Sequence, residues 1–191
     1  MYKMCKTEQS ARRQRLLEQG LLRTMGSHHY EEISVSDLCE QIGIPRKSFY
    51  RYFSGKDGAL HALIDHTLLE YDGFSMHRAG PMLEVSQKEL EGFFLFWRNQ
   101  KPLLDALARS GLSGVLIERT IDQALAEVGS PRQQWSRKPP DLRAHATMFG
   151  VCGIMSMVVT WHSGDYLQDH RQMAQIALKL VTEPLFESQK G

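Results

Sequence analysis

Residues 33–53 read ISVSDLCEQIGIPRKSFYRYF, and this stretch decides the fold of the N-terminal part. Ser34 and Asp37 match the start of a capping box, in which a hydroxyl and an acid three residues later bind free backbone N–H groups. Apolar residues at i, i+3 and i+7 give the following helix one apolar stripe. Gly43 ends that helix, because glycine accepts the left-handed backbone of a helix end. The stretch therefore predicts two short helices joined by a glycine turn.

The second of these helices starts at Pro45, whose fixed φ and missing N–H suit a first helical position. Phe49 and Phe53, four residues apart, are predicted to face inward, which leaves cations, hydroxyls and tyrosines on the outer faces. A helix of this kind after a glycine turn is the arrangement that enters the major groove of DNA. The predicted DNA-binding residues are Ser34, Ser36, Arg46, Lys47, Ser48, Tyr50, Arg51, Tyr52 and Lys56.

Different roles are expected within this set. Lys47 and Ser48 are predicted to reach base edges, whereas Tyr50, Arg51 and Lys56 are predicted to contact phosphates. The charge distribution agrees, because residues 1–56 hold ten Lys and Arg against six Asp and Glu, and the rest of the chain holds thirteen against sixteen. A basic surface that is merely solvated is the alternative interpretation of these side chains.

Residues 12–69 resemble the N-terminal domain of the TetR family of bacterial transcriptional repressors. The most specific shared feature is the string FYRYF at residues 49–53, followed by Lys56. The resemblance implies an all-α protein with a three-helix helix-turn-helix DNA-binding domain at residues 1–55. It implies a helical ligand-binding and dimerisation domain at residues 56–191.

The resemblance also implies a mechanism and two partners. Members of the family bind a pseudo-palindromic double-stranded DNA operator as homodimers and bind a small-molecule effector in the C-terminal body. Effector binding shifts the fourth helix, changes the separation of the two DNA-binding heads and releases the operator. The expected function is therefore that of a ligand-released repressor, and the sequence names neither the effector nor the operator.

Two positions depart from the family pattern. His29 stands where the family usually carries glycine, and histidine adopts a positive φ only at a cost, so a strained or slightly longer turn is predicted there. Pro45 stands where the family commonly has a serine or threonine as the helix cap. A hydroxyl that could contact a phosphate is therefore missing at the start of the recognition helix.

The rest of the chain reads as helical throughout, because no alternating pattern of Val, Ile and Thr predicts a strand. Ser86 and Glu89 predict a second capping box, and Gly80 with Pro81 predicts a break. The predicted helices span residues 56–77, 87–100, 102–110, 112–128, 141–163 and 168–186, with a polar loop at 129–140.

Large and adaptable side chains in this half predict an apolar cavity for an effector. Few charges interrupt these helices, so the expected effector is apolar or weakly cationic, with His145, Arg119 or Glu118 as a polar anchor. A solid aromatic core is the alternative. The predicted ligand-binding residues are Phe93, Phe94, Trp97, Leu104, Leu107, Met148, Cys152, Met155 and Trp161.

Small residues in the last long helix predict a homodimer. Gly150, Gly153 and Ser156 are three apart and form a flat face for close helix contact. Packing within one chain is the alternative, and a contact between the last two helices of two copies is preferred. The predicted interface residues are Gly150, Gly153, Met157, Val158, Ile176 and Leu180.

Composition and missing motifs exclude other classes. With 42% hydrophobic residues, a mean hydropathy of -0.36 and no secretion signal, the chain reads as a cytoplasmic soluble protein. Its most apolar stretch, residues 148–161, is too short to span a membrane. No HExxH, GxSxG or phosphate loop is present, so no enzymatic activity, cofactor or metal is expected. The competing interpretation is a helical small-molecule-binding or interaction protein without operator-specific DNA binding.

Overall fold

The protein is all-α, as predicted, in a computed structural model that describes residues 2, 5, 7–76, 86–126 and 139–183. Apart from an isolated antiparallel bridge between Tyr2 and Phe53, the regular structure of these residues is helical. The chain forms two compact units, and each is built from two separate segments. Unit 1 comprises Met1–His77 and Pro102–Gln123, and unit 2 comprises Arg78–Lys101 and Ala124–Gly191.

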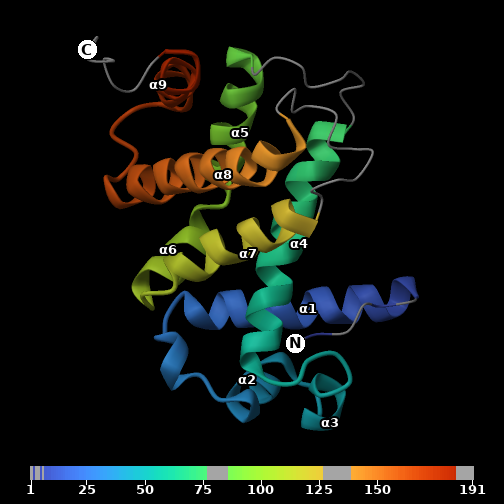
Figure 1. Cartoon of the computed structure of the whole chain (residues 1–191). Coiled ribbons are helices and arrows are strands. Elements are labelled where there is room, and N and C mark those ends of the chain that lie inside the picture. Colours follow the sequence, from blue (N-terminus) through green and yellow to red (C-terminus); the bar gives the residue numbers. More distant parts are fainter. Residues whose placement is uncertain (1, 3–4, 6, 77–85, 127–138, 184–191) are drawn as a thin grey trace. The chain divides into compact units, whose positions relative to one another are not determined.

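Unit 1 contains the predicted helix-turn-helix. Its N-terminal elements are α1 (Glu8–Met25), the 3-10 turn η1 (Tyr30–Glu32), α2 (Val35–Ile42), α3 (Arg46–Phe49) and α4 (Lys56–Met76). Helix α1 packs against both α2 and α4, and α2 packs against α3 (Figure 1). We call the elements α1 to α3 the head. The helix-turn-helix is therefore held through α2 by α1, which in turn packs against α4.

The turn between α2 and α3 forms as the sequence predicts. Ser34 Oγ accepts a hydrogen bond of 3.1 Å from the N–H of Asp37, and Gly43 ends α2 in the left-handed region at φ +73°. Helix α3 ends at Phe49 and therefore does not extend to Phe53. Turn hydrogen bonds continue beyond it, and the N–H of Phe53 donates to the carbonyl of Phe49 at 3.2 Å. Both phenylalanines are buried, as predicted.

The predicted strain at His29 is wrong. His29 has φ -67°, which is ordinary extended backbone. Its N–H donates to Glu32 Oε2 at 3.1 Å, so η1 starts with a capping interaction and needs no positive φ. Pro45 is the N-cap of α3 and makes no side-chain capping bond, in line with the missing hydroxyl.

Unit 1 is completed by most of α6 (Lys101–Arg109) and α7 (Ser113–Ala126). Asp65 of α4 is only 2% exposed and accepts hydrogen bonds from Arg119 of α7 at 2.9 and 2.6 Å. The hydroxyl of Tyr2 donates to the same carboxylate at 2.9 Å. This carboxylate therefore ties α7 and an N-terminal residue to the central helix of the unit.

Arg119, which the sequence suggested as one possible polar anchor of a ligand cavity, already has partners within unit 1. Its guanidinium is held by Asp65 and by Asp122 at 2.9 Å, and the hydrogen bond to Asp65 raises the pKa of Arg119 above its ordinary value. The division into domains at residues 55 and 56 stays a prediction. The compact unit that contains the head also contains chain from beyond residue 101.

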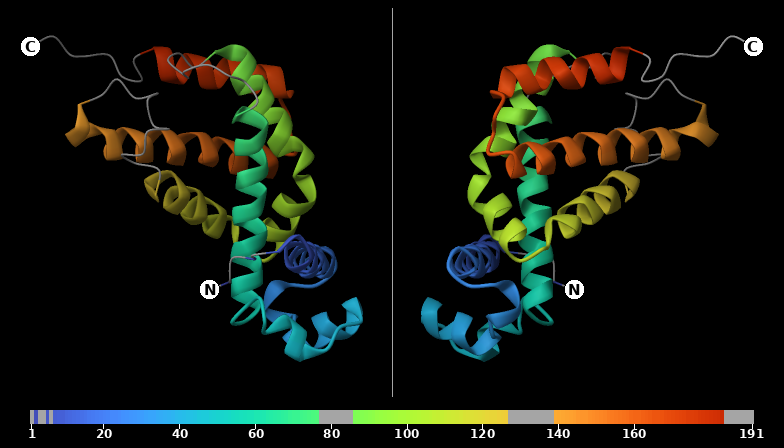
Figure 2. Two further views of the ribbon diagram at one scale, coloured as in Figure 1. Left: turned by 90° about the vertical axis from the view of Figure 1, so that its right-hand side faces the viewer. Right: turned by 90° about the vertical axis from the view of Figure 1, so that its left-hand side faces the viewer.

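Unit 2 consists of α5 (Gln87–Asn99), α8 (Pro140–Ser163) and α9 (His170–Thr182). Helix α5 packs against α9 and α8, and both views of Figure 2 show α9 (red) beside α5 (green). Ser86 and Glu89 form the predicted capping box at the start of α5. The predicted break at residues 80 and 81 and most of the loop at 129–140 lie outside the described residues.

Candidate nucleic-acid interface

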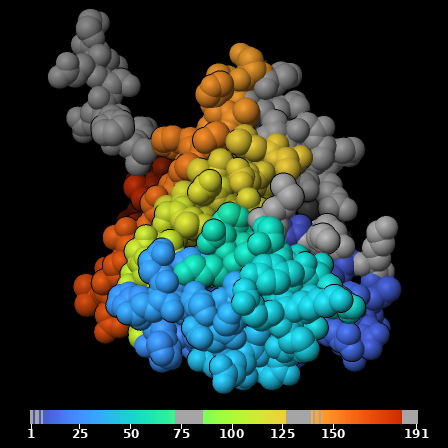
Figure 3. All heavy atoms as spheres, turned by 90° about the horizontal axis from the view of Figure 1, so that it is seen from below, coloured from blue at the N-terminus to red at the C-terminus, as the bar shows by residue number. Residues whose placement is uncertain are grey.

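The exposed side of α3 and of the turn after it carries cations without acidic partners. Arg46, Lys47 and Arg51 are exposed, and Tyr50 is 45% exposed beside them. Within the described residues, the side chains of Lys47 and Arg51 make no hydrogen bond or ion pair. Figure 3 views the face on which the segment from η1 through α3 (light blue to cyan) lies toward the viewer. Two cations are therefore available to an anionic partner such as the DNA backbone.

Arg46 and Tyr50 form a pair along this surface. They are four residues apart, and Arg46 Nη2 lies 3.4 Å from the Tyr50 hydroxyl. The guanidinium carbon lies 5.9 Å from the centre of the tyrosine ring. This contact raises the pKa of Arg46 above its ordinary value. The pair orients two of the predicted DNA-binding side chains before any partner arrives.

Four other predicted DNA-binding residues have mixed surroundings. Ser34 is exposed, but its hydroxyl already serves Asp37, since it accepts from the backbone N–H and donates to Oδ2 at 2.7 Å. Ser36 is exposed in the first turn of α2. Ser48 and Tyr52 are half-buried, and the Tyr52 ring lies 6.2 Å from that of Phe53. The hydroxyl of Ser36 is therefore more available than that of Ser34 for a hydrogen bond to a phosphate.

Lys56 is bound within unit 1. Its ammonium donates to the backbone carbonyls of Tyr30 at 2.7 Å and Glu31 at 3.2 Å, and it lies 4.5 Å from the centre of the Tyr30 ring. An ammonium has three donors, so these two bonds leave one for another acceptor. Phosphate contact by Lys56 stays a prediction, and the structure adds a role for Lys56 in joining α4 to η1.

Tyr30 connects three elements and was not singled out from the sequence as a functional residue. Its hydroxyl donates to Asp57 at 2.6 Å in the first turn of α4, and its N–H donates to the hydroxyl of Ser110 at 3.0 Å, directly after α6. Burial, followed by the hydrogen bond to Asp57, raises the pKa of Tyr30 far above its ordinary value. Because Tyr30 and Ser110 are 80 positions apart, no local pattern could have shown their contact.

The predicted ligand-binding residues are divided between the two units. Leu104 and Leu107 are buried in unit 1, whereas the other seven belong to unit 2. Among those seven, Met148 is exposed and Cys152 is half-buried. The remaining five are buried: Phe93, Phe94, Trp97, Met155 and Trp161.

The aromatic members of this set pack edge to face. The Phe94 ring lies 5.3 Å from that of Phe93 and 5.6 Å from that of Trp161, and the Phe93 ring lies 6.4 Å from that of Trp97. These are ordinary core contacts. Trp97 Nε1 is nevertheless buried without a hydrogen-bond partner among the described residues. An effector that accepts one hydrogen bond would satisfy it, and the ligand-binding role of the cluster stays a prediction.

The predicted dimer residues divide by exposure. Gly150 and Gly153 face open space, since a Cβ at either would meet no neighbouring atom of the described residues within 4 Å. Ile176 and Leu180 on α9 are exposed by 39% and 45%. Val158 is fully buried within the chain, so its side chain is not exposed for contact with a second copy. Met157 is half-buried.

Helix α8 also leaves large apolar side chains uncovered. Phe149 is 74% exposed, and Leu142 is half-exposed. By length and composition alone, Ala144–Ser163 could cross a membrane, and it is the only such segment among the described residues. Its exposed residues also include the two glycines and the polar Thr160.

Comparison with known proteins agrees with the architecture of unit 1. Residues 20–63 match the family model described as bacterial regulatory proteins, tetR family. These residues run from the second half of α1 through the first turns of α4, and therefore include α2, the glycine turn and α3. No curated protein gives a significant match to the sequence.

Solved structures share the fold over most of the chain. The dihydroxyacetone kinase operon activator DhaS aligns with a TM-score of 0.56 and 14% identity, over 88% of this chain and 93% of that one. The fatty acid degradation regulator FadR from Bacillus halodurans aligns with a TM-score of 0.59 and 13% identity, over 95% and 98%. A tetR-family transcriptional regulator from Streptomyces coelicolor aligns with a TM-score of 0.51 and 18% identity, over 87% of this chain and 78% of that one.

At such identities the likeness between structures shows the fold alone, and the similarity to the tetR family rests on residues 20–63. The matched segment contains the features that the structure shows for a helix-turn-helix, namely the left-handed Gly43, the buried Phe49 and the exposed cations of α3. The head of this chain is therefore a helix-turn-helix domain of the kind found in the tetR family of bacterial regulatory proteins.

Proposed function

We propose that this regulator is a cytoplasmic repressor that binds a pseudo-palindromic operator as a homodimer and releases it when a small molecule binds the C-terminal body. The observation that carries the proposal is the set of exposed cations on α3 and the turn after it, two of which have no partner in the described part of the chain. Cations on a groove-entering helix supply both phosphate attraction and contact with base edges. The proposed readers of base edges are Lys47 and Ser48.

The proposed dimer rests on the uncovered apolar faces of α8 and α9. Phe149, Ile176 and Leu180 are exposed, and the open Gly150 and Gly153 allow a partner helix to approach the backbone closely. A single head makes few contacts, whereas two heads about 34–36 Å apart reach successive major grooves on one face of the duplex. The second copy would thus cover the apolar faces and supply the second reading helix.

The proposed effector is an apolar or weakly cationic molecule that contacts the aromatic cluster of unit 2. The buried indole N–H of Trp97 supports this proposal, because a donor without an acceptor is costly unless a ligand provides one. Since effector and operator act on one molecule, the effector must lower operator affinity by the same factor by which the operator lowers effector affinity.

A mobility-shift assay with the DNA upstream of the protein's own gene tests operator binding. We expect Lys47→Ala to change the preference between operator variants by about 1–3 kcal/mol, as loss of one good base contact would. Arg51→Ala is expected to weaken binding to all sequences and to reduce the salt dependence by about one phosphate contact. Lys88→Ala removes an exposed lysine from α5 and serves as the matched control.

The outcomes separate the proposal from its competitor. If Lys47→Ala and Arg51→Ala both bind like the Lys88→Ala control at low salt, α3 does not enter the groove. If the unaltered protein also shows no preference for its upstream DNA, the interpretation as a small-molecule-binding or interaction protein is favoured. The direction of regulation is read from a reporter gene, since DhaS, which shares the fold, is named as an activator.

A further inference from the structure

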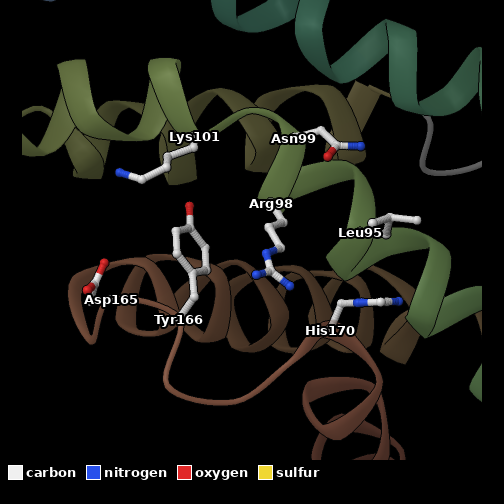
Figure 4. A pocket seen from close by; sticks show the side chains of 7 residues that line it. All are labelled: Leu95, Arg98, Asn99, Lys101, Asp165, Tyr166 and His170. Atoms are coloured by element: carbon white, nitrogen blue, oxygen red, sulfur yellow. The ribbon is translucent and has the colours of Figure 1, made fainter.

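Unit 2 contains a solvent-open pocket of about 590 Å³ whose lining includes no member of the aromatic cluster. One wall is the end of α5 and the first residue of α6, and the other is the turn between α8 and α9 (Figure 4). A volume of this size accommodates a small metabolite. The lining residues are Leu95, Arg98, Asn99, Lys101, Asp165, Tyr166 and His170, and all of them belong to unit 2.

The charges around this pocket favour an anion. Arg98, Lys101 and His170 contribute nitrogen-bearing side chains, and Asp165 is the only carboxylate in the lining. In Figure 4 Arg98 extends from α5 toward the opposite wall, between Tyr166 and His170. The guanidinium of Arg98 has no hydrogen bond or ion pair within the described residues. Its planar fork of N–H groups matches the paired oxygens of a carboxylate or a phosphate.

His170 provides a second group that lacks a partner. Its Nδ1 atom is buried and makes no hydrogen bond to any described residue. A buried polar atom without a partner destabilises the protein, so it marks a place where a ligand or an ion would be favourable. A neutral imidazole with its proton on Nδ1, or an imidazolium, can donate a hydrogen bond to an anionic oxygen.

The wall opposite Arg98 is a strained turn. Asp165 and Tyr166 are consecutive non-glycine residues with φ of +51° and +55°, which is rare for a bulky side chain such as tyrosine. The N–H of Tyr166 donates to the carbonyl of Trp161 at 3.0 Å, and the two rings meet edge to face at 4.8 Å. These contacts hold the unusual backbone and place the Tyr166 ring in the pocket wall.

We infer that this pocket binds a small organic anion, a carboxylic acid or a phosphate monoester. Arg98 and Lys101 supply the positive charge, His170 donates a hydrogen bond, and the Tyr166 ring forms one side. The site differs in residues and in chemistry from the apolar effector site proposed above. It also stands independently of operator binding, because none of its residues belongs to the head.

Isothermal titration calorimetry of the full chain, without DNA, tests the inference. Inorganic phosphate and succinate serve as probes, and we expect saturable binding of at least one of them. The probe that binds more tightly identifies the preferred class of anion. Arg98→Gln is expected to weaken binding by about tenfold or more, as loss of a charge-assisted hydrogen bond would. His170→Ala should weaken it by a smaller factor.

Arg109→Gln is the matched control, because Arg109 is an exposed arginine at the end of α6 in unit 1. It is expected to bind the probe like the unaltered protein. Two results would overturn the inference: no saturable binding of either probe at millimolar concentrations, or equal loss of affinity in Arg98→Gln and Arg109→Gln, which indicates unspecific attraction. Circular dichroism of Arg98→Gln verifies that the variant folds. The calorimetry contains no DNA, so a failure of the protein to bind an operator would not change the measured affinity for the anion.

Discussion

Replacement of Asp65 with alanine is expected to lower the free energy of unfolding of the protein by about 3 kcal/mol. Asp65 is 2% exposed and accepts two hydrogen bonds from Arg119 and one from Tyr2. Its removal leaves a guanidinium that is 22% exposed with only Asp122 as a partner. The expected loss of stability lies at the lower end of the range for removal of one partner of a buried ion pair, because Asp122 and solvent still reach Arg119. Urea unfolding followed by circular dichroism measures it.

Two further variants distinguish the ion pair from a general effect of substitution. Asp122 is 55% exposed at its side chain, so Asp122→Ala is expected to change stability by no more than about 0.5 kcal/mol. The double variant Asp65→Leu with Arg119→Leu removes both charges and should recover much of the loss, since no unpaired charge remains. Equal stability of Asp65→Ala and Asp122→Ala would show that the buried pair contributes nothing.

A charge on the uncovered face of α9 is expected to abolish dimerisation and to weaken operator binding by about 10²–10⁴-fold. Ile176 and Leu180 are four residues apart on one side of α9, and both are exposed in the protomer. Ile176→Glu or Leu180→Glu would place a carboxylate in an apolar contact, where burial of an unpaired charge is costly. The loss in DNA affinity follows because the second head no longer binds as part of the same molecule.

Light scattering measures the mass of each variant, and fluorescence anisotropy with labelled operator measures affinity. Gln175→Glu is the matched control, because it adds the same charge at the neighbouring exposed polar position of α9. We expect it to remain dimeric and to bind the operator normally. A dimeric Leu180→Glu variant with unchanged operator affinity would place the subunit contact elsewhere.

The sequence predicted the features of the head that depend on neighbouring residues. The Ser34 cap, the left-handed Gly43 and the inward Phe49 and Phe53 follow from rules that act within one or two helical turns, and the structure has all of them. His29 shows the limit of a family comparison, because its capping bond to Glu32 removes the need for glycine at that position. A side chain three residues away was sufficient to change the turn.

The features that the sequence did not predict depend on distant residues. Arg119 and Asp65 are 54 positions apart, and their charges alone do not identify them as partners. The pocket of unit 2 joins the end of α5 to a turn more than sixty residues later. The left-handed residues of this turn are Asp165 and Tyr166, whereas the neighbouring Gly164 has a negative φ. Val158 looked like an interface residue because helical spacing alone cannot tell which apolar side of α8 meets its own protomer.

The discontinuity of unit 1 limits how reading heads can be exchanged between relatives. A chimera joined once, directly after residue 77, would carry Asp65 and Tyr30 but would receive foreign residues in place of Arg119 and Ser110. Such a fusion would inherit a buried carboxylate without its cation. Transplanting the operator specificity of this protein therefore requires either two junctions that also move residues 102–123 or a recipient that already carries the matching arginine.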